Sequence, residues 1–269
     1  MKTHDAFDRA GRLAAMLLAC LAAACQPAGE RAAPAPEGAQ AGADAALAER
    51  VLNASPYTLR ADAELAAYVQ RTAEDAIAQH CATCHGADLT GKPGVPNLVD
   101  FDWLWAITFE ETTEVESVMK IEQTIRHGIR NTDCPLIADQ ALYGSCPDTR
   151  YSEMPAYLAD GLLDASQVDD LVEWVVSLSG GDADPEAVER AQAIRGVCAE
   201  CHGPDGFGYK PYGGPDLTDD VWLYGGDRAT IRDVIANGRL GMCPAWGNTL
   251  DAATIKSLAL YIWQKANEG

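Results

Sequence analysis

Two short segments bring together thiols and an imidazole at a spacing that could do chemistry. They are Cys81-Ala82-Thr83-Cys84-His85 and Cys198-Ala199-Glu200-Cys201-His202. In the pattern C-x-x-C-H, two thiols add to the vinyl groups of a haem and the histidine reaches the iron from one side. A structural zinc site built from two cysteine pairs is the competing interpretation, and the histidine directly after each pair disfavours it. The sequence predicts two covalently bound haem c groups, attached by Cys81, Cys84, Cys198 and Cys201 and ligated by His85 and His202.

Each iron needs a ligand on its opposite face, and a thioether is usual in electron-transfer cytochromes. Met154, which precedes a proline, is expected opposite His85. The corresponding position for His202 is occupied by Cys243, with Met242 one residue earlier. Three alternatives follow: the Cys243 thiolate ligates the second iron, Met242 ligates it through a shifted loop, or the site is open. A thiolate would place this haem's potential well below that of a Met-ligated haem.

Other residues are expected to support the haems. The ring nitrogen of an axial histidine that faces away from the iron needs an acceptor, and a loop carbonyl after the motif usually supplies it. Pro96 and Pro215 are the candidates, although both could simply be turn prolines. Candidates for contacting the haem propionates, which could equally be surface or core residues, are Trp103, Trp222, Arg130 and Arg239.

The elements that position these residues follow from an internal repeat. The landmarks occur in the same order twice: Pro96-Asn97-Leu98 corresponds to Pro215-Asp216-Leu217, and Met154-Pro155-Ala156 to Cys243-Pro244-Ala245. A repeat in which several landmarks recur in the same order is typical of tandem domains.

Each copy is expected to end in a helix. Apolar residues recur there at helical spacing, and Asp164 and Asp251 stand at the expected N-caps. The apolar positions are Val168, Leu171, Val172 and Val175 in the first copy and Ile255, Leu258, Ala259 and Ile262 in the second. Signals for strands are weak throughout. The predicted fold class is mainly α, with each domain wrapped around one covalent haem.

The remaining composition indicates an exported protein. Residues 1–25 have a basic start and a short apolar run, which predicts a signal peptide. The run ends in Leu-Ala-Ala-Ala-Cys25, which resembles a lipoprotein signal with Cys25 as a lipid anchor; a plain cleaved signal is the alternative. Residues 26–50 are expected to form a flexible Ala/Pro-rich tether, and domains are predicted at 51–180 and 185–269. No later stretch resembles a transmembrane helix.

The net charge indicates which kinds of partner the chain attracts, and the remaining cysteines indicate a disulfide and a candidate ligand. Acidic residues number 40 against 20 basic ones, for a formal charge of -20. Such a chain repels nucleic acid and attracts basic protein partners. Export favours a disulfide between Cys134 and Cys146, in a segment much longer than its counterpart in the second copy. Cys243 is then left without a cysteine partner, which favours a role as a ligand.

With these residues in hand, the chain resembles the di-haem subunit III of cbb-type cytochrome c oxidases, the CcoP or FixP family. The resemblance covers residues 70 to 268 and includes Asp102-Trp103-Leu104-Trp105, Thr124–Arg130 and Trp222-Leu223-Tyr224-Gly225-Gly226. It implies two class I cytochrome c domains that pass electrons from soluble or membrane donors towards an oxidase's catalytic subunit. The chain departs from the family in two respects: the family normally has a transmembrane anchor, and normally Met at the position of Cys243.

The expected function is electron transfer on the periplasmic side of a bacterial membrane, by a protein that is not an enzyme by itself. Its expected partners are redox proteins, such as a donor cytochrome or oxidase subunits. One alternative is a di-haem oxidoreductase acting on a sulfur compound such as thiosulfate at a Cys-ligated haem. Another is a gas or redox sensor with an open haem.

Overall fold

The computed structural model describes residues 37–100, 102–105, 113–131, 148–209 and 212–268. The chain divides into a segment that ends at Ala41 and a compact unit from Gly42 to Gly269, and the account below concerns the second. The predicted signal peptide, Cys25 and the predicted disulfide between Cys134 and Cys146 lie outside the described residues.

The described residues are mainly helical, which confirms the predicted fold class. Pairing between extended segments occurs there only as isolated bridges. The helices are α1 (Glu37–Asn53), α2 (Pro56–Ala61), α3 (Ala63–Ala76), the π-helical turn η1 (Ile77–Cys81), α4 (Ala82–His85), α5 (Glu114–His127), α6 (Ala165–Leu178), α7 (Pro185–Ala191), α8 (Gly196–His202), α9 (Arg228–Asn237) and α10 (Ala252–Asn267).

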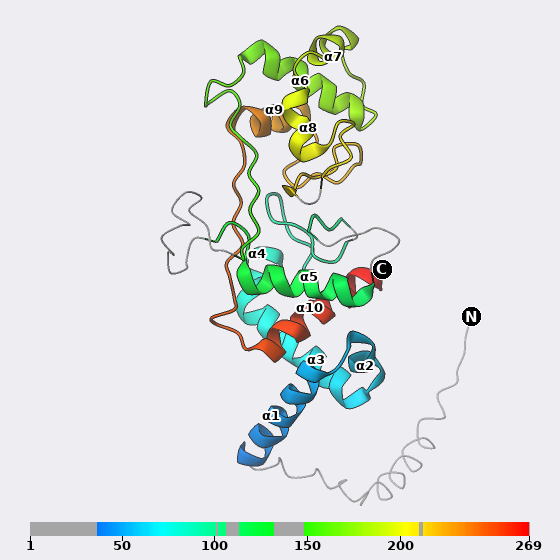
Figure 1. Ribbon diagram of the computed structural model, residues 1–269, viewed down its shortest axis with the longest axis vertical. Coiled ribbons are helices and arrows are strands. Elements are labelled where there is room, and N and C mark those ends of the chain that lie inside the picture. Colours follow the sequence, from blue (N-terminus) through cyan, green and yellow to red (C-terminus); the bar gives the residue numbers. More distant parts are fainter. Residues whose placement is uncertain (1–36, 101, 106–112, 132–147, 210–211, 269) are drawn as a thin grey trace, which may run out of the picture. The chain divides into compact units, whose positions relative to one another are not determined.

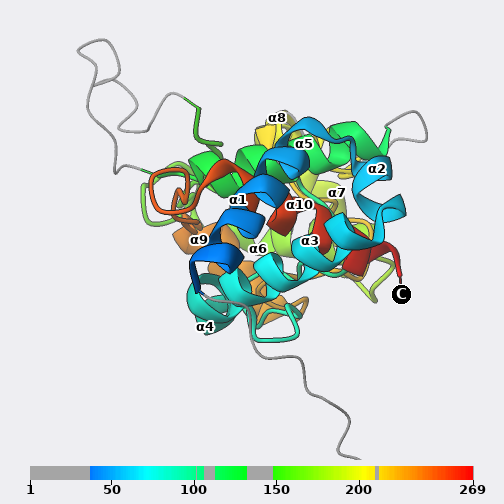
Figure 2. The same cartoon turned by 90° about the horizontal axis from the view of Figure 1, so that it is seen from below.

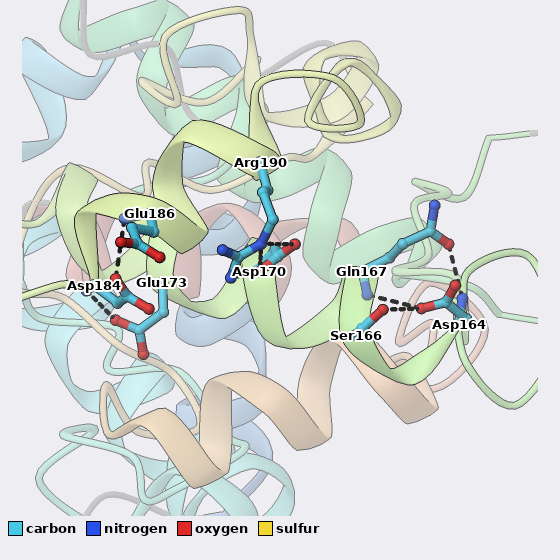
Figure 3. A network of polar contacts seen from close by, with 8 residues as sticks. All are labelled: Asp164, Ser166, Gln167, Asp170, Glu173, Asp184, Glu186 and Arg190. Atoms are coloured by element: carbon cyan, nitrogen blue, oxygen red, sulfur yellow. Dashed lines mark hydrogen bonds and ion pairs between the residues drawn. The ribbon is translucent and has the colours of Figure 1, made fainter.

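The closing helices begin at the predicted caps. The Asp164 carboxylate accepts the Gln167 backbone N–H at 2.9 Å, and Asp251 accepts from Thr254 at the same distance. Figure 3 shows the Asp164 cap and, further along α6, the ion pair of Asp170 with Arg190 of α7. The two caps satisfy backbone donors that a helix start leaves without partners. The ion pair links α7 to α6, against which α7 also packs.

The two closing helices exchange places between the repeats. Helix α6, which ends the first repeat, packs against α7 and α9 of the second. Helix α10, which ends the second repeat, packs against α3 and α5 of the first. Figures 1 and 2 show α10 in red lying against these two helices, and Figure 1 shows α6 grouped with α7, α8 and α9. Each helical group is therefore built from both repeats.

The buried residues follow the same exchange. The predicted apolar faces of α6 and α10 are both buried. The face of α6 joins a core with Ile231 and Ile235 of α9 and with Cys198. From α10, Leu258 and Ile262 join Ala73 and Ala76 of α3, with Cys81 packed against them. A helix with one apolar stripe buries it against any complementary surface, so the repeat pattern alone does not determine which copy receives it.

The helical groups α3–α5–α10 and α6–α9 therefore do not coincide with the sequence segments 51–180 and 185–269. The boundary between residues 180 and 185 stays a prediction about where the repeat divides in the sequence. In space, the chain crosses from the first group to α6 and returns to α10 after α9.

The flexible tether predicted over residues 26–50 is wrong from Glu37 onward, where α1 begins. This segment is rich in alanine, the strongest helix former. Near its end, Val51 is fully buried, with Leu47 and Ala48 packed against the same core. No helix among the described residues is long and apolar enough to cross a membrane.

Candidate haem sites

The first C-x-x-C-H motif lies on the helical residues between the end of α3 and the following loop. Helix α3 continues through η1 to Cys81, and α4 carries the motif to His85. The helix ends at Gly86, which has a φ of 80° that favours glycine. His85 Nδ1 lies 3.0 Å from the Pro96 carbonyl oxygen. Both thiols and the imidazole thus lie on one short stretch of helix.

The second motif repeats this geometry on α8. His202 is buried at 7% exposure, and its Nδ1 lies 2.9 Å from the Pro215 carbonyl oxygen. Gly203, with a φ of 76°, ends the helix as Gly86 does in the first motif. Cys198 is also buried, within the core that α6 and α9 form. The structure therefore places Pro96 and Pro215 in equivalent positions beside the two histidines.

The donor atoms fit covalent haems. Burial lowers the pKa of both His85 and His202, partly offset by the hydrogen bond to the proline carbonyl, so both imidazoles are neutral at physiological pH. With Nδ1 held by a carbonyl, Nε2 is the atom left to face an iron. Among the described residues, no three His, Cys, Asp or Glu side chains are grouped to hold a metal ion by themselves.

The segments that carry the candidate distal ligands also cross between the repeats. Met154 exchanges two backbone hydrogen bonds with Arg239, at 3.0 and 2.9 Å, just after α9. Cys243 exchanges two with Ile129, at 2.9 and 3.1 Å, just after α5. Met154 packs against the core that contains Cys198.

Aromatic residues three positions later confirm the crossing. The Tyr157 hydroxyl donates to the carbonyl of Val197, the residue before Cys198, at 3.0 Å. The Trp246 ring lies 5.0 Å from the ring of His80, the residue before Cys81.

The contacts of the described residues do not follow the expected pairing of Met154 with His85, and of Cys243 or Met242 with His202. The structure places Met154 on the side of the second motif and Cys243 on the side of the first. The physical reason is that each ligand segment continues into a closing helix, and α6 and α10 are exchanged.

Two glycines make this close pairing possible. A Cβ atom on Gly128 would collide with the carbonyl oxygen of Cys243, and one on Gly238 with that of Met154. Both glycines have positive φ, 72° and 67°. They occupy equivalent positions at the ends of α5 and α9, where only glycine admits the crossing segment.

The two neighbours at the unusual ligand position differ in burial. The Met242 side chain is 65% exposed. Cys243 is partly buried, and burial raises the pKa of its thiol to about 11, against a decrease from Arg130. Of the two candidates, Cys243 is the one that the structure places near Cys81 and Cys84.

The four residues considered for propionate contacts lie in different surroundings. The Trp103 indole donates to the Asp100 carbonyl at 2.8 Å, and Trp222 packs against the core of α6 and α9. Arg239 pairs with Asp233 and lies over the Tyr224 ring. The Arg130 guanidinium donates to the carbonyls of Gly241 and Ser152. Their contact with propionates stays a prediction.

Tyr157, Trp246 and Tyr224 were missed from the sequence. A signal for the first two was present, because both repeats place an aromatic residue three positions after the candidate distal ligand. Tyr224 lies where the repeats meet: its ring is the nearest neighbour of Gly94, whose N–H donates to the Leu223 carbonyl at 2.8 Å. Its position depends on contacts between loops far apart in the sequence.

Comparisons with known proteins match both repeats. The family model described as cytochrome c oxidase, cbb3-type, subunit III matches residues 185–262, and the cytochrome c model matches residues 69–179.

Among curated proteins, the cbb3-type oxidase subunit CcoP of Cereibacter sphaeroides is 39% identical over 221 residues, covering 82% of this chain and 69% of that protein. The subunit FixP of Azorhizobium caulinodans is 38% identical over 222 residues, covering 81% and 67%. CcoP of Rhodobacter capsulatus is 35% identical over 225 residues, covering 81% and 69%. The comparisons give no support to the alternative of a sulfur-compound oxidoreductase.

Proposed function

The chain belongs to the CcoP/FixP family of cbb3-type cytochrome c oxidase subunits, and from this we propose that it carries electrons from a donor redox protein to the subunits that reduce oxygen. It is a di-haem c-type cytochrome and an electron-transfer protein, not the catalyst itself. The observation that carries the proposal is the pair of C-x-x-C-H turns with matched histidine–proline contacts. The oxidase is its partner at the level of the complex, on the membrane.

A haem c at each site supplies a one-electron couple between ferric and ferrous iron. The chain's own residues determine how that couple behaves. The thiols of each motif hold the ring covalently, and the carbonyls of Pro96 and Pro215 orient the imidazoles. The buried cores around Cys81 and Cys198 exclude water and lower the local dielectric constant.

The proposed ligand sets follow the crossing. His202 and Met154 form one pair, and His85 and Cys243 the other. The contacts of Tyr157 with Val197 and of Trp246 with His80 support this assignment, because each sets a distal-ligand segment beside the start of one motif. The thiolate pair is expected to have the lower potential, so the two haems are unequal.

Attachment to the membrane is proposed through Cys25. A lipid at this position followed by a tether would keep the haem domains beside a membrane complex on its periplasmic side. Release of Cys25→Ser from washed membranes, with the wild type retained, would support this anchor. Equal retention of both proteins would contradict it.

The function is tested by reconstitution. Protein carrying both haems, reduced by a donor cytochrome, is mixed with a cbb3-type oxidase preparation lacking its subunit III, and oxygen consumption and haem oxidation are followed together. Rapid reoxidation with restored oxygen consumption is expected. A matched Cys198→Ala/Cys201→Ala variant, which lacks one attachment site, should lose most of this activity. Failure of the reduced wild type to be reoxidised would contradict the proposal.

A further inference from the structure

Arg130 lies between the two distal-ligand segments, which are the stretches of chain that lead to Met154 and to Cys243. It follows Ile129, which forms a parallel bridge with Arg150 on one side and an antiparallel bridge with Cys243 on the other. The Arg130 backbone N–H donates to the Arg150 carbonyl at 2.7 Å. The residue therefore enters between the segment leading to Met154 and the segment leading to Cys243.

The guanidinium contacts both segments at equivalent positions. Nε donates to the Gly241 carbonyl and Nη1 to the Ser152 carbonyl. Each carbonyl stands two residues before a candidate ligand, Cys243 in one segment and Met154 in the other. Because each contacted carbonyl lies only two positions before its ligand, holding these carbonyls restricts the positions of both ligand side chains.

The chemistry of arginine suits this task. Its planar fork presents several N–H donors in a fixed geometry, whereas lysine offers a flexible point charge. Arg130 also has a φ of 51°, in the left-handed region that residues with a Cβ seldom adopt. Such a conformation persists where the surrounding contacts determine it, and it is often found at functional sites.

Neighbouring arginines make no such bridge. Arg239 bonds to Gly238 and Asp233 of its own repeat. Arg150 donates to Thr124, Lys120 and Gln123 of α5.

We propose that Arg130 is a positioning residue that ties the two distal-ligand segments together and so sets the ligand geometry of both haems at once. The inference rests on the proposed ligation by Cys243 and Met154. It adds that one side chain, which is not itself a proposed ligand, controls both sites.

The test compares Arg130→Gln, Arg130→Lys and the control Arg150→Gln in the full chain carrying both haems. The readouts are the electron paramagnetic resonance signals of the two ferric haems, the thioether-to-iron absorption band, and a potentiometric titration. Arg130→Gln is expected to change both signals, weaken the thioether band and shift both midpoint potentials, with two haems still attached. Arg130→Lys should recover part of each change, and Arg150→Gln should match the wild type.

A folded Arg130→Gln protein in which one haem or neither haem changes would overturn the inference. If that variant loses its helical circular dichroism, Arg130→Lys decides: shifts in both haems support the inference, and a wild-type spectrum overturns it. A wild type without any thioether band would overturn the proposed ligation together with this inference. That result would be seen before any variant is made, so the two failures are distinguishable.

Discussion

At the scale of single residues, the two haem sites differ most at one position. Both have a C-x-x-C-H turn and a histidine held by a proline carbonyl. Cys243 lies near the first motif, and Met154 packs against the core of the second. An anionic sulfur stabilises ferric iron more than a neutral thioether does, so under the proposed ligation this position would determine how the two potentials are ordered.

We predict that Cys243→Met raises the potential of one haem and leaves the other nearly unchanged. A neutral thioether replaces the thiolate, so the ferrous state becomes easier to reach. Potentiometric titration followed by visible spectroscopy measures both haems in one experiment. Met242→Leu is the control and should titrate like the wild type, because Met242 is largely exposed. A change caused by Met242→Leu alone would contradict the assignment.

A second prediction concerns Tyr157, whose pKa burial raises to about 12, with an additional contribution from the nearby Glu200. Its hydroxyl donates to Val197, so the protonated form is the one that stabilises the fold. Because the folded pKa exceeds the unfolded value near 10, this contribution is complete below about pH 10 and is lost as the pH rises through about 12. Thermal unfolding between pH 8 and pH 12 should therefore show a steeper alkaline loss than in Tyr157→Phe. Parallel curves would contradict the prediction.

Residues whose role depends on near neighbours were predictable from the sequence. The haem motifs, Pro96 and Pro215 and the caps Asp164 and Asp251 all lie close in sequence to the groups they contact. The pairing of Met154 and Cys243 with particular motifs was not predictable, because both repeats present the same Gly and Pro-Ala landmarks. The local sequence therefore does not determine which ligand segment lies beside which motif.

At the scale of elements, the exchange of α6 and α10 makes each haem site depend on both repeats. The periodicity of the two helices and their buried faces were predictable, since a 3.6-residue pattern defines an apolar stripe. Their partners were not, because nearly identical faces fit either group and the choice depends on long-range contacts.

Leu171→Ala on α6 is expected to destabilise the surroundings of the second motif by about 2–5 kcal/mol, the usual range for a fully buried leucine. Leu258→Ala on α10 should do the same around the first motif. Both side chains are buried, at 0% and 1% exposure. Denaturant titration, followed by the separate ligand spectra of the two haems, shows which site loosens first. The account is contradicted if each variant loosens the haem motif of its own repeat.

At the scale of the whole molecule, the formal charge of -20 governs how partners approach. Long-range attraction raises the association rate of a basic partner and is screened by salt. This charge, and the attraction of basic partners that follows from it, could be predicted from the composition alone. The membrane anchor proposed at Cys25 and the disulfide predicted between Cys134 and Cys146 lie outside the described residues and stay predictions.

The bimolecular rate of reduction by a basic donor cytochrome should fall steeply as ionic strength rises from 0.01 M to 0.15 M, where the screening length shrinks from about 30 Å to about 8 Å. Stopped-flow mixing measures this rate. An acidic donor of similar potential serves as the control and should become faster with salt. The same salt response for both donors would contradict an electrostatic role.

The crossed ligand sets are the central claim, and nuclear magnetic resonance of the reduced protein tests them most directly. Selective labelling of methyl groups is practical because the chain has five methionines. The account predicts that the Met154 methyl resonance shows the strong shift of an axial ligand and nuclear Overhauser effects to the haem attached at Cys198 and Cys201. Nuclear Overhauser effects from that methyl group to the haem attached at Cys81 and Cys84 would contradict it.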